Sequence, residues 1–323
     1  MAAGGAIYDN WREGGRVMEH DSGSVLLVYP PEDYAPGGFR KDFQLNIGGL
    51  PLGIIYIASH LKANGIDVEL YDARTDFDFE SIKSVSKNEP FRLGASDEQI
   101  RRKIQSISPG IVGISSLFLS RLDDVFNVCS LVKQVDAEIM TVVGGPSCSI
   151  MSMELFELCR DVDAIVLGEG EEVFLELVRA VRKKEQFNQM ESVILRADIG
   201  VRRNFPAPAF VEDLDGLTCP DYGLLDMDPY FRLAKMNLLP RLTWRENLME
   251  RSVPVISSRG CPYNCIFCTR RLHNTNRWRS ESPEHFVGRL NELKKRFCID
   301  HFYMEDDAWN VSARRFEKVL DLM

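Results

Sequence analysis

The stretch V-P-V-I-S-S-R-G-C-P-Y-N-C-I-F-C occupies residues 253–268 and places three cysteines in a C-x3-C-x2-C pattern behind a short apolar run. Such a run predicts a buried strand, which would deliver the loop that follows it. Three thiolates on one loop can bind three irons of a four-iron cluster, and the fourth iron then has no protein ligand. The loop therefore predicts an iron–sulfur cluster on Cys261, Cys265 and Cys268, with one iron open to chemistry.

Zinc is the alternative metal for this loop, because Cys265 and Cys268 alone form a C-x2-C pair of the kind that zinc sites use. A zinc site needs further ligands nearby. Cys298 and His273 are the close candidates in sequence, and neither is paired with a second ligand at short spacing. The spacing favours the iron–sulfur cluster and leaves zinc as the open alternative.

The composition indicates a globular protein whose 323 residues, 45% of them hydrophobic, suffice for two domains with separate cores. A formal net charge of -9 argues against general affinity for nucleic acid. The sequence shows neither a secretory signal pattern nor a run of about eighteen apolar residues, so we expect a cytoplasmic protein without a membrane span. Eight cysteines fit a reducing compartment, and the five outside the loop are expected to be ordinary core or surface residues: Cys129, Cys148, Cys159, Cys219 and Cys298.

Short apolar runs alternate with helical patterns from Ser24 onward, after an extension over residues 1–23 that we expect to be poorly ordered. Near-continuous apolar runs separated by amphipathic helices predict a parallel sheet covered on both faces. The expected fold class over residues 24–190 is a doubly wound α/β domain of the flavodoxin or Rossmann type. The predicted strands are 25–29, 68–71, 111–114, 139–143 and 164–167, and the predicted helices are 52–64, 97–106, 122–135, 152–159 and 172–184.

Ligands of such sheets bind beyond the carboxyl ends of the strands, near the switch in strand order. Glycines in the turns at these ends permit close approach of the backbone, and short hydroxyl side chains can form hydrogen bonds with a ligand. The same turns also suit tight strand-to-helix connections with no ligand. The candidate binding residues are Ser115, Ser116 and Leu117, then Gly144, Gly145, Pro146 and Ser147, then Gly168, Glu169 and Gly170.

Two nucleotide-binding motifs are missing from the sequence. No G-x-G-x-x-G follows the first predicted strand, and no G-x4-G-K-[ST] occurs, which disfavours a nicotinamide or nucleoside triphosphate site.

Residues 191–252 are interrupted by prolines and predict an interdomain connection, with short helices and a small hairpin of 192–196 with 201–203. Residues 253–323 return to a strand–helix pattern. Its helix covers 283–297, its second strand 301–304 and its last helix 313–323.

Three acidic residues, Glu305, Asp306 and Asp307, follow the second strand of that pattern. Barrels of strand–helix units place functional groups at such positions, and a carboxylate can accept hydrogen bonds from an ammonium group. The alternative role of these acids is to stabilise the N-terminus of the last helix.

The string S-R-G-C-P-Y-N-C-I-F-C at 258–268 resembles the cluster-binding signature of the radical S-adenosylmethionine (radical SAM) superfamily, including the aromatic Phe267. The resemblance implies a 4Fe-4S cluster whose fourth iron is chelated by the methionyl amine and carboxylate of S-adenosylmethionine. One electron from the cluster would then cleave the sulfonium to a 5′-deoxyadenosyl radical. The string Y-M-E-D-D-A-W at 303–309 resembles the second-strand motif of the same family, so residues 253–323 are expected to be the first units of a partial (β/α)6 barrel.

The strings V-V-G-G-P at 142–146 and D-A-I-V-L-G-E-G-E at 163–171, with P-L-G-I-I-Y-I-A-S-H-L at 51–61, resemble the cobalamin-binding domain that precedes the radical module in one branch of this superfamily. The resemblance implies a corrin over the strand ends, with its nucleotide tail beside the third and fourth strands. Cobalamin domains of the mutase type carry D-x-H-x-x-G after the first strand. This chain has P-P-E-D-Y at 30–34, so we expect cobalt without a protein histidine ligand.

The implied function is that of a cobalamin-dependent radical SAM methyltransferase that acts on an unactivated carbon or phosphorus centre. In that scheme the 5′-deoxyadenosyl radical abstracts a hydrogen and methylcobalamin supplies the methyl group. The alternatives are a ring-forming, cyclase-type enzyme of the same family and an inert cobalamin-binding protein. A methylthiotransferase is disfavoured, because such enzymes carry a second cluster on N-terminal cysteines and no cysteine precedes Cys129. The expected partners are a small-molecule substrate and a reductant such as flavodoxin or ferredoxin.

About sixty residues follow Cys261, whereas relatives complete a barrel of six strand–helix units. We therefore expect a chain interrupted within the radical SAM module: a fragment, a truncated product, or one half of an enzyme completed by a second chain. Exposed strand edge and apolar surface are expected near residue 323.

Overall fold

The computed structural model describes residues 24–34, 49–77, 89–183, 190–196, 207–235, 251–269 and 276–323. The predicted extension 1–23 and the predicted strand 201–203 lie outside the described residues. The chain divides into two compact units, each of which is described by itself. The first comprises Met1–Asp33, Gly53–Phe77 and Arg92–Phe210, and the second comprises Tyr34–Leu52, Asp78–Phe91 and Val211–Met323.

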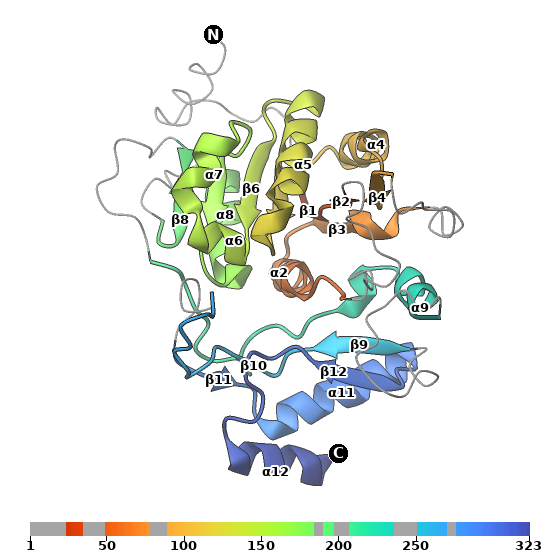
Figure 1. Cartoon of the computed structure of the whole chain (residues 1–323), viewed down its shortest axis with the longest axis vertical. Coiled ribbons are helices and arrows are strands. Elements are labelled where there is room, and N and C mark those ends of the chain that lie inside the picture. The colour runs from red at the N-terminus through yellow and green to blue at the C-terminus, as the bar shows by residue number, and fades with distance from the viewer. Residues whose placement is uncertain are drawn as a thin grey trace. The chain divides into compact units, whose positions relative to one another are not determined.

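A six-stranded sheet forms the centre of the first unit, in the order β3-β1-β5-β6-β7-β8 (Figure 1). Five of these strands, β3, β1, β5, β6 and β7, pair in parallel, and their order is the 2-1-3-4-5 of flavodoxin-like sheets. The predicted doubly wound α/β class is therefore confirmed. The strands are β1 Val25–Tyr29, β3 Val68–Asp72, β5 Ile111–Ser115, β6 Met140–Gly144, β7 Ala164–Val166 and β8 Val193–Leu195.

The strand β8 extends the main sheet beyond the predicted strands. Val193–Leu195, predicted as part of a linker hairpin, pair antiparallel with β7, and the other predicted strand of that hairpin, 201–203, lies outside the described residues. All three residues of β8 are buried. Their burial stabilises β8 in the sheet, because a short apolar strand gains most where both of its faces are covered.

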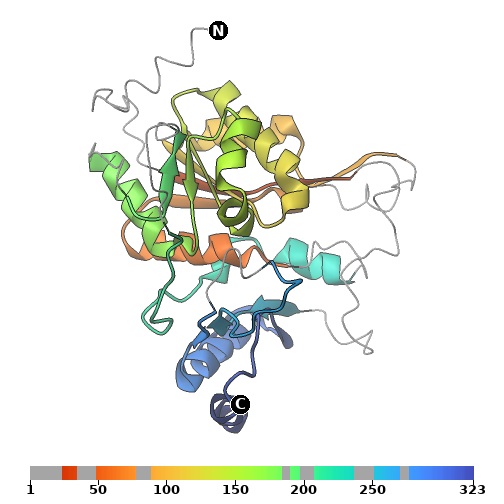
Figure 2. The same ribbon diagram turned by 60° about the vertical axis from the view of Figure 1, so that its left-hand side comes forward.

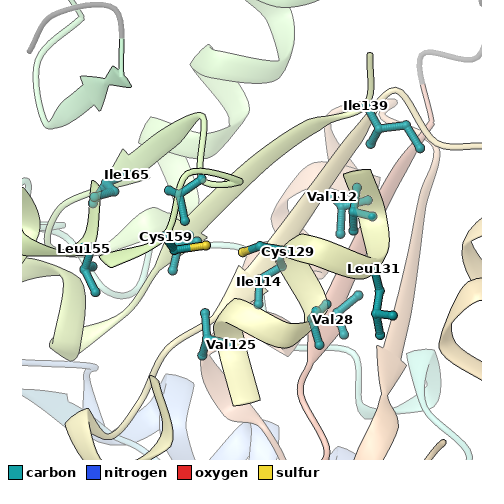
Figure 3. Packing of buried hydrophobic residues seen from close by; sticks show 14 of the residues in the cluster. Val28, Val112, Ile114, Val125, Cys129, Leu131, Ile139, Leu155, Cys159 and Ile165 are labelled. Atoms are coloured by element: carbon teal, nitrogen blue, oxygen red, sulfur yellow. The ribbon is translucent and has the colours of Figure 1, made fainter. Parts of the chain in front are cut away.

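Helices cover both faces of this sheet (Figure 2). Leu26, Val28 and Ile114 point from the strands into one core, which they share with residues of α4, α5 and α7; Figure 3 shows Cys129 and Leu131 of α5 in this core. On the other face, Gly113 of β5 lies against Phe174 of α8. The helices are α2 Leu52–Ala63, α4 Asp97–Ile107, α5 Leu122–Val135, α6 Pro146–Ile150, α7 Ser152–Leu158 and α8 Gly170–Lys183, with 3-10 turns η2 Ala73–Thr75 and η3 Leu119–Arg121.

The second unit contains two parallel strands, β9 and β12, which pair in the register Val253↔Phe302. Each is followed along the chain by a long helix, as predicted for the first strand–helix units of a barrel. Its elements are η5 Tyr222–Leu224, α9 Asp228–Lys235, β9 Ser252–Val255, β10 Ser258–Arg259, β11 Arg279–Ser280, α11 Pro283–Phe297, β12 His301–Met304 and α12 Ala313–Leu322. A separate small ladder joins β2 Glu32–Tyr34 with β4 Phe91–Leu93.

Two buried arginines of the second unit bond the backbone that follows β9. Arg289 of α11 donates from Nη2 to Ile256 O at 2.7 Å. Arg315 of α12 donates from Nη2 to Ser257 O at 3.1 Å and from Nε to Glu281 O at 2.9 Å. Both helices therefore fix the same short segment of chain.

Near residue 323, the expected apolar surface is confirmed, since Val311, Leu320, Leu322 and Met323 are exposed. Within the described part of the chain, β12 pairs with β9 alone, as expected for an exposed edge. None of the helices in that part has the length and hydrophobicity that a membrane crossing requires.

Gly94 is expected to be essential for the stability of the first unit. It has φ +112°, and a Cβ at this position would collide with the carbonyl oxygen of Ala73. We expect Gly94→Ala to lower the free energy of unfolding by about 2 kcal/mol, because both the backbone conformation and the contact are unfavourable. The matched control is Gly53→Ala on the exposed first turn of α2, where a Cβ meets nothing within 4 Å. Equal midpoints of urea unfolding for the two variants would contradict the prediction.

Candidate functional site

The predicted binding turns after β5 and β6 are joined by backbone hydrogen bonds. Ser116 N–H donates to Gly144 O at 2.7 Å, and Ser147 N–H donates to Ser116 O at 3.3 Å. Gly145 has φ +118°, and a Cβ there would lie 2.6 Å from Ser116 O. Gly145 is therefore required for the close approach of the two turns. The structure brings together the two predicted groups, 115–117 and 144–147.

Two hydroxyl groups at these turns are buried without an oxygen or nitrogen partner among the described residues. They are Ser116 Oγ and Ser147 Oγ. Ser116 Oγ lies instead beside the thiol of Cys148, whose pKa is raised to about 12 chiefly by burial. A buried hydroxyl without a partner costs free energy, so Ser147 Oγ suits a polar group of a bound molecule, and Ser116 Oγ, whose neighbour is a thiol and therefore a weak partner, can form a further hydrogen bond. The residues present therefore fit a polar cofactor at this edge of the sheet.

The turn after β7 is braced from within the first unit. Gly168 has φ +79° and forms an isolated bridge with Ala209. Gly168 N–H donates to Ser149 Oγ at 3.1 Å, and Glu169 N–H donates to Ala209 O at 2.8 Å. Gly170 begins α8, and a Cβ there would lie 2.9 Å from Ile57 Cδ1 of α2. Each of these three predicted residues has a structural reason for its place, and their role in binding stays a prediction.

An exposed apolar patch follows the two serines after β5. Leu117, Phe118 and Leu119 are 43%, 46% and 40% exposed. Leu117 is one of the binding residues predicted from the sequence, whereas Phe118 and Leu119 are not. The available signal was an unbroken run of large apolar residues in a turn that otherwise contains serine, since a turn normally places polar residues outside.

Charged side chains hold the loop after β1, the position at which cobalamin domains of the mutase type carry a histidine. Glu32 is buried, and its Oε2 lies 3.3 Å from Arg121 Nη2. Asp33 N–H donates to Asp124 Oδ1 at 3.1 Å, and Arg121 Nη1 donates to Asp33 O at 2.6 Å. The loop is therefore fixed by its own ion pairs.

A second ion pair lies behind this loop. Arg74 is buried and pairs with Asp72, with Nε–Oδ1 at 2.9 Å and Nη2–Oδ2 at 2.7 Å. The guanidinium also stacks over the ring of Tyr29, 3.8 Å from its centroid. Two hydrogen bonds and one aromatic face hold this arginine in place, so the end of β1 is rigid.

Asp124 should make the stability of the first unit depend on pH. Burial raises the pKa of this carboxyl from 3.8 to about 6. A raised pKa means that the folded state favours the protonated form, so stability falls as pH rises from about 4 to about 7. Asp124→Asn keeps an oxygen that accepts from Asp33 N–H and does not ionise. We expect the free energy of unfolding of the wild type, measured with urea, to fall relative to that of this variant by about 1–3 kcal/mol over that pH range. A difference between the two proteins that stays constant across the range would contradict the raised pKa of Asp124.

In the second unit, the three predicted metal ligands lie on a loop closed at its base by a short ladder. The strands β10 and β11 pair Ser258 with Ser280 and Arg259 with Arg279. Gly260, directly before the first cysteine, has φ +84°. Cys261 and Cys268 are half-buried and Cys265 is exposed, and all three are free thiols. The predicted cofactor residue Phe267 is 87% exposed on the same loop.

The loop does not gather its thiols into a metal site in this conformation. Across the described residues, no group of three or more His, Cys, Asp and Glu side chains is close enough to hold a metal. The donor set nevertheless fits an iron–sulfur cluster, since it offers three free and accessible thiols on one loop. For the zinc alternative, Cys298 is exposed at the end of α11, and His273 lies outside the described residues.

Asp306 fixes the start of the cysteine loop. Its carboxylate accepts hydrogen bonds from Ser257 N–H at 3.1 and 3.2 Å, from Ser257 Oγ at 3.0 Å and from Ser258 Oγ. Glu305 is exposed, and its N–H donates to Val255 O at 2.9 Å, while Asp307 is half-buried. The carboxylate of Asp306 is thus engaged within the chain, and the assignment of all three acids to cofactor binding stays a prediction.

We expect Asp306→Asn to loosen this loop. An asparagine offers one acceptor oxygen where the carboxylate offers two, so part of the bonding to Ser257 and Ser258 is lost, at a cost of about 1–3 kcal/mol. Iron and sulfide bound per chain after anaerobic reconstitution should fall, and limited proteolysis within the loop should become faster. Asp300→Asn, a change of the same kind at an exposed position of the same unit, is the control. Equal iron content and equal cleavage in both variants would refute the role of Asp306.

Comparison with known proteins finds a matching domain model and several similar proteins. Residues 48–178 match the B12 binding domain. An uncharacterized methyltransferase of Pyrococcus horikoshii is 28% identical over 90% of this chain and 55% of its own length. The cytidylyl-2-hydroxyethylphosphonate methyltransferase of Streptomyces wedmorensis is 26% identical over 88% of this chain and 54% of its own. The anaerobic magnesium-protoporphyrin IX monomethyl ester cyclase of Rubrivivax gelatinosus is 28% identical over 90% and 46%.

The fold agrees with a solved structure. The radical S-adenosylmethionine methyltransferase TsrM of Kitasatospora setae, solved with tryptophan and a SAM analog, matches 93% of this chain and 50% of its own with a TM-score of 0.64 and 16% identity. The chain is thus similar in sequence to two methyltransferases and a cyclase and similar in fold to a radical S-adenosylmethionine methyltransferase, and part of it matches the B12 binding domain. It spans about half the length of the curated relatives it matches.

Proposed function

We propose that this chain provides the cobalamin-binding and cluster-binding part of a radical SAM methyltransferase that acts on an unactivated carbon or phosphorus centre. The observation that carries the proposal is the C-x3-C-x2-C loop after β9, in a chain whose residues 48–178 match the B12 binding domain. Two of the three relatives compared by sequence are named as methyltransferases, and one of these is a phosphonate methyltransferase.

The cysteine loop is the proposed site of the 4Fe-4S cluster and S-adenosylmethionine. When bound, the cluster and S-adenosylmethionine supply one-electron chemistry, and cobalamin supplies a transferable methyl group. Cys261, Cys265 and Cys268 would bind three irons as thiolates. The base of the loop is held by Asp306 through Ser257 and Ser258. Because the base of the loop is anchored, the three thiols have fewer accessible positions before they bind iron.

The edge of the main sheet at β5 and β6 is the proposed cobalamin site. Ser116 and Ser147 offer buried hydroxyls to polar groups of the cofactor. The exposed side chains of Leu117 and Phe118 offer apolar surface to the corrin and keep water from it. The ion pair of Glu32 with Arg121 occupies the loop after β1, which supports cobalt without a histidine ligand from this loop.

A ring-forming reaction is the second candidate function. The Rubrivivax gelatinosus relative, named as a cyclase, is as similar in sequence as the first methyltransferase, at 28% identity. An inert cobalamin-binding protein is the third. Each of the first two functions needs a small-molecule substrate and an electron donor such as flavodoxin or ferredoxin, and we place the protein in the reducing cytoplasm. Further strand–helix units, on this polypeptide or on a second one, are part of the proposal.

Anaerobic reconstitution with iron and sulfide tests the cluster. We expect about four irons per chain and their loss when Cys261, Cys265 and Cys268 are all changed to alanine. Fewer irons in the wild type, or cluster absorbance that survives the triple change, would refute the cluster assignment.

Reconstitution with hydroxocobalamin and S-adenosylmethionine under reductant separates the three functions. Transfer of a labelled methyl group from S-adenosylmethionine to the bound cobalamin is the result expected for a methyltransferase. Formation of 5′-deoxyadenosine without label transfer would favour the ring-forming enzyme. Cobalamin retained through gel filtration with neither product would favour the inert binding protein.

A further inference from the structure

One cysteine of the second unit lies beside a histidine, outside the cysteine loop. Cys219 is exposed in the segment before η5, and its Sγ lies 3.5 Å from Nε2 of His285. His285 is in the first turn of α11, where Ser282 Oγ accepts from its backbone N–H at 3.3 Å. The thiol and the imidazole are therefore brought together by a loop and a helix that lie far apart in sequence.

Carboxylates fix the orientation of this imidazole. His285 Nδ1 lies 3.1 Å from Glu281 Oε2 and 3.6 Å from Asp215 Oδ1. Glu281 is buried, and Arg289 Nη2 holds its other oxygen at 2.7 Å. Because a carboxylate accepts hydrogen bonds, Nδ1 carries the proton, and in the neutral ring the lone pair of Nε2 faces Cys219. Cys219 is thus placed as a nucleophile, His285 as its base and Glu281 as the group that orients the base.

The surroundings of Cys219 make this base necessary. Burial of the sulfur raises the pKa of the thiol, Arg289 lowers it, and Glu281, Glu292 and Asp215 raise it further. The thiol is therefore protonated at neutral pH. It becomes a nucleophile only when a neighbour takes its proton, since the thiolate is the reactive form.

We propose that Cys219, His285 and Glu281 form a thiol-modification site that reacts with small cationic disulfides. In the reaction, the proton of Cys219 Sγ moves to His285 Nε2 and the sulfur attacks one sulfur of the disulfide. The disulfide bond breaks as the new S–S bond forms. The leaving thiolate takes the proton from Nε2, so that one mixed disulfide and one free thiol result and no other oxidant is consumed.

The charge of the site selects the partner. Asp215, Glu281 and Glu292 are close enough to act on Cys219, and Arg289 is the cation that opposes them. A negative surrounding attracts cations and repels anions, and salt weakens both effects. Cystamine, a small disulfide with two ammonium groups, should therefore react faster at Cys219 than oxidised glutathione, which is anionic.

Cys298 supplies the control within the same molecule. It is also exposed, it ends α11, and its thiol makes no hydrogen bond with the described residues. The anaerobically reconstituted protein is treated with cystamine at neutral pH, and the mixed disulfide at each cysteine is followed over time by peptide mass mapping. We expect Cys219 to react about tenfold faster than Cys298 or more. Its preference for cystamine over oxidised glutathione should shrink as salt is added.

A variant of the base completes the test. We expect His285→Gln to slow the reaction of cystamine with Cys219 about tenfold and to leave its rate of reaction with Cys298 unchanged. Equal rates at Cys219 and Cys298 in the wild type would overturn the proposal, and so would an unchanged rate at Cys219 in the variant. If the rate at Cys298 also changes, the variant has altered the fold. In that case the proposal is judged on the wild type alone, by the ratio of the reaction rates at Cys219 and Cys298 and by the effect of salt on the preference for cystamine.

Discussion

Parallel pairing of buried strands is the constraint on which both candidate sites depend. In a parallel sheet, every strand ends at the same edge, so loops that are distant in sequence meet there. The turns after β5 and β6 meet in this way, where Ser147 donates to the carbonyl of Ser116. Pairing of β9 with β12 likewise brings Asp306 to Ser257. The pairing of the apolar strands therefore determines which polar residues of the following loops lie close together.

Most of the fold could be predicted from the sequence because its strands are continuous apolar runs. The run at 25–29 became β1 with the predicted bounds, and the helix at 122–135 became α5. The strand β8 could not be predicted as part of the main sheet, because its three residues carry no information about their partner. Period and length identify a strand, whereas pairing depends on tertiary contacts.

The candidate site divides in the same way. Spacing alone nominated Cys261, Cys265 and Cys268 as ligands, and this assignment stays a prediction, because the structure places them on one loop as free thiols without gathering them into a metal site. The hydrogen bonds of Asp306 and the contact of Cys219 with His285 join residues that are 49 and 66 positions apart, and no local pattern carries that information. The sequence also predicted a loop without histidine after β1. The ion pairs that fill it depend on Arg121 and Asp124, which come from another part of the chain.

The backbone bonds that fix the start of the cysteine loop also bear on how the chain reaches its native state. Ser257 is held by Asp306 and Arg315, which lie 49 and 58 residues further along. A ribosome makes the cysteines well before it makes their anchors, so the nascent loop is unrestrained for that interval. Closing a connection of this length also costs conformational entropy, and contacts between residues close in sequence do not offset that cost early in folding. We therefore expect this loop to become ordered only after the segment up to Arg315 has been made and has packed.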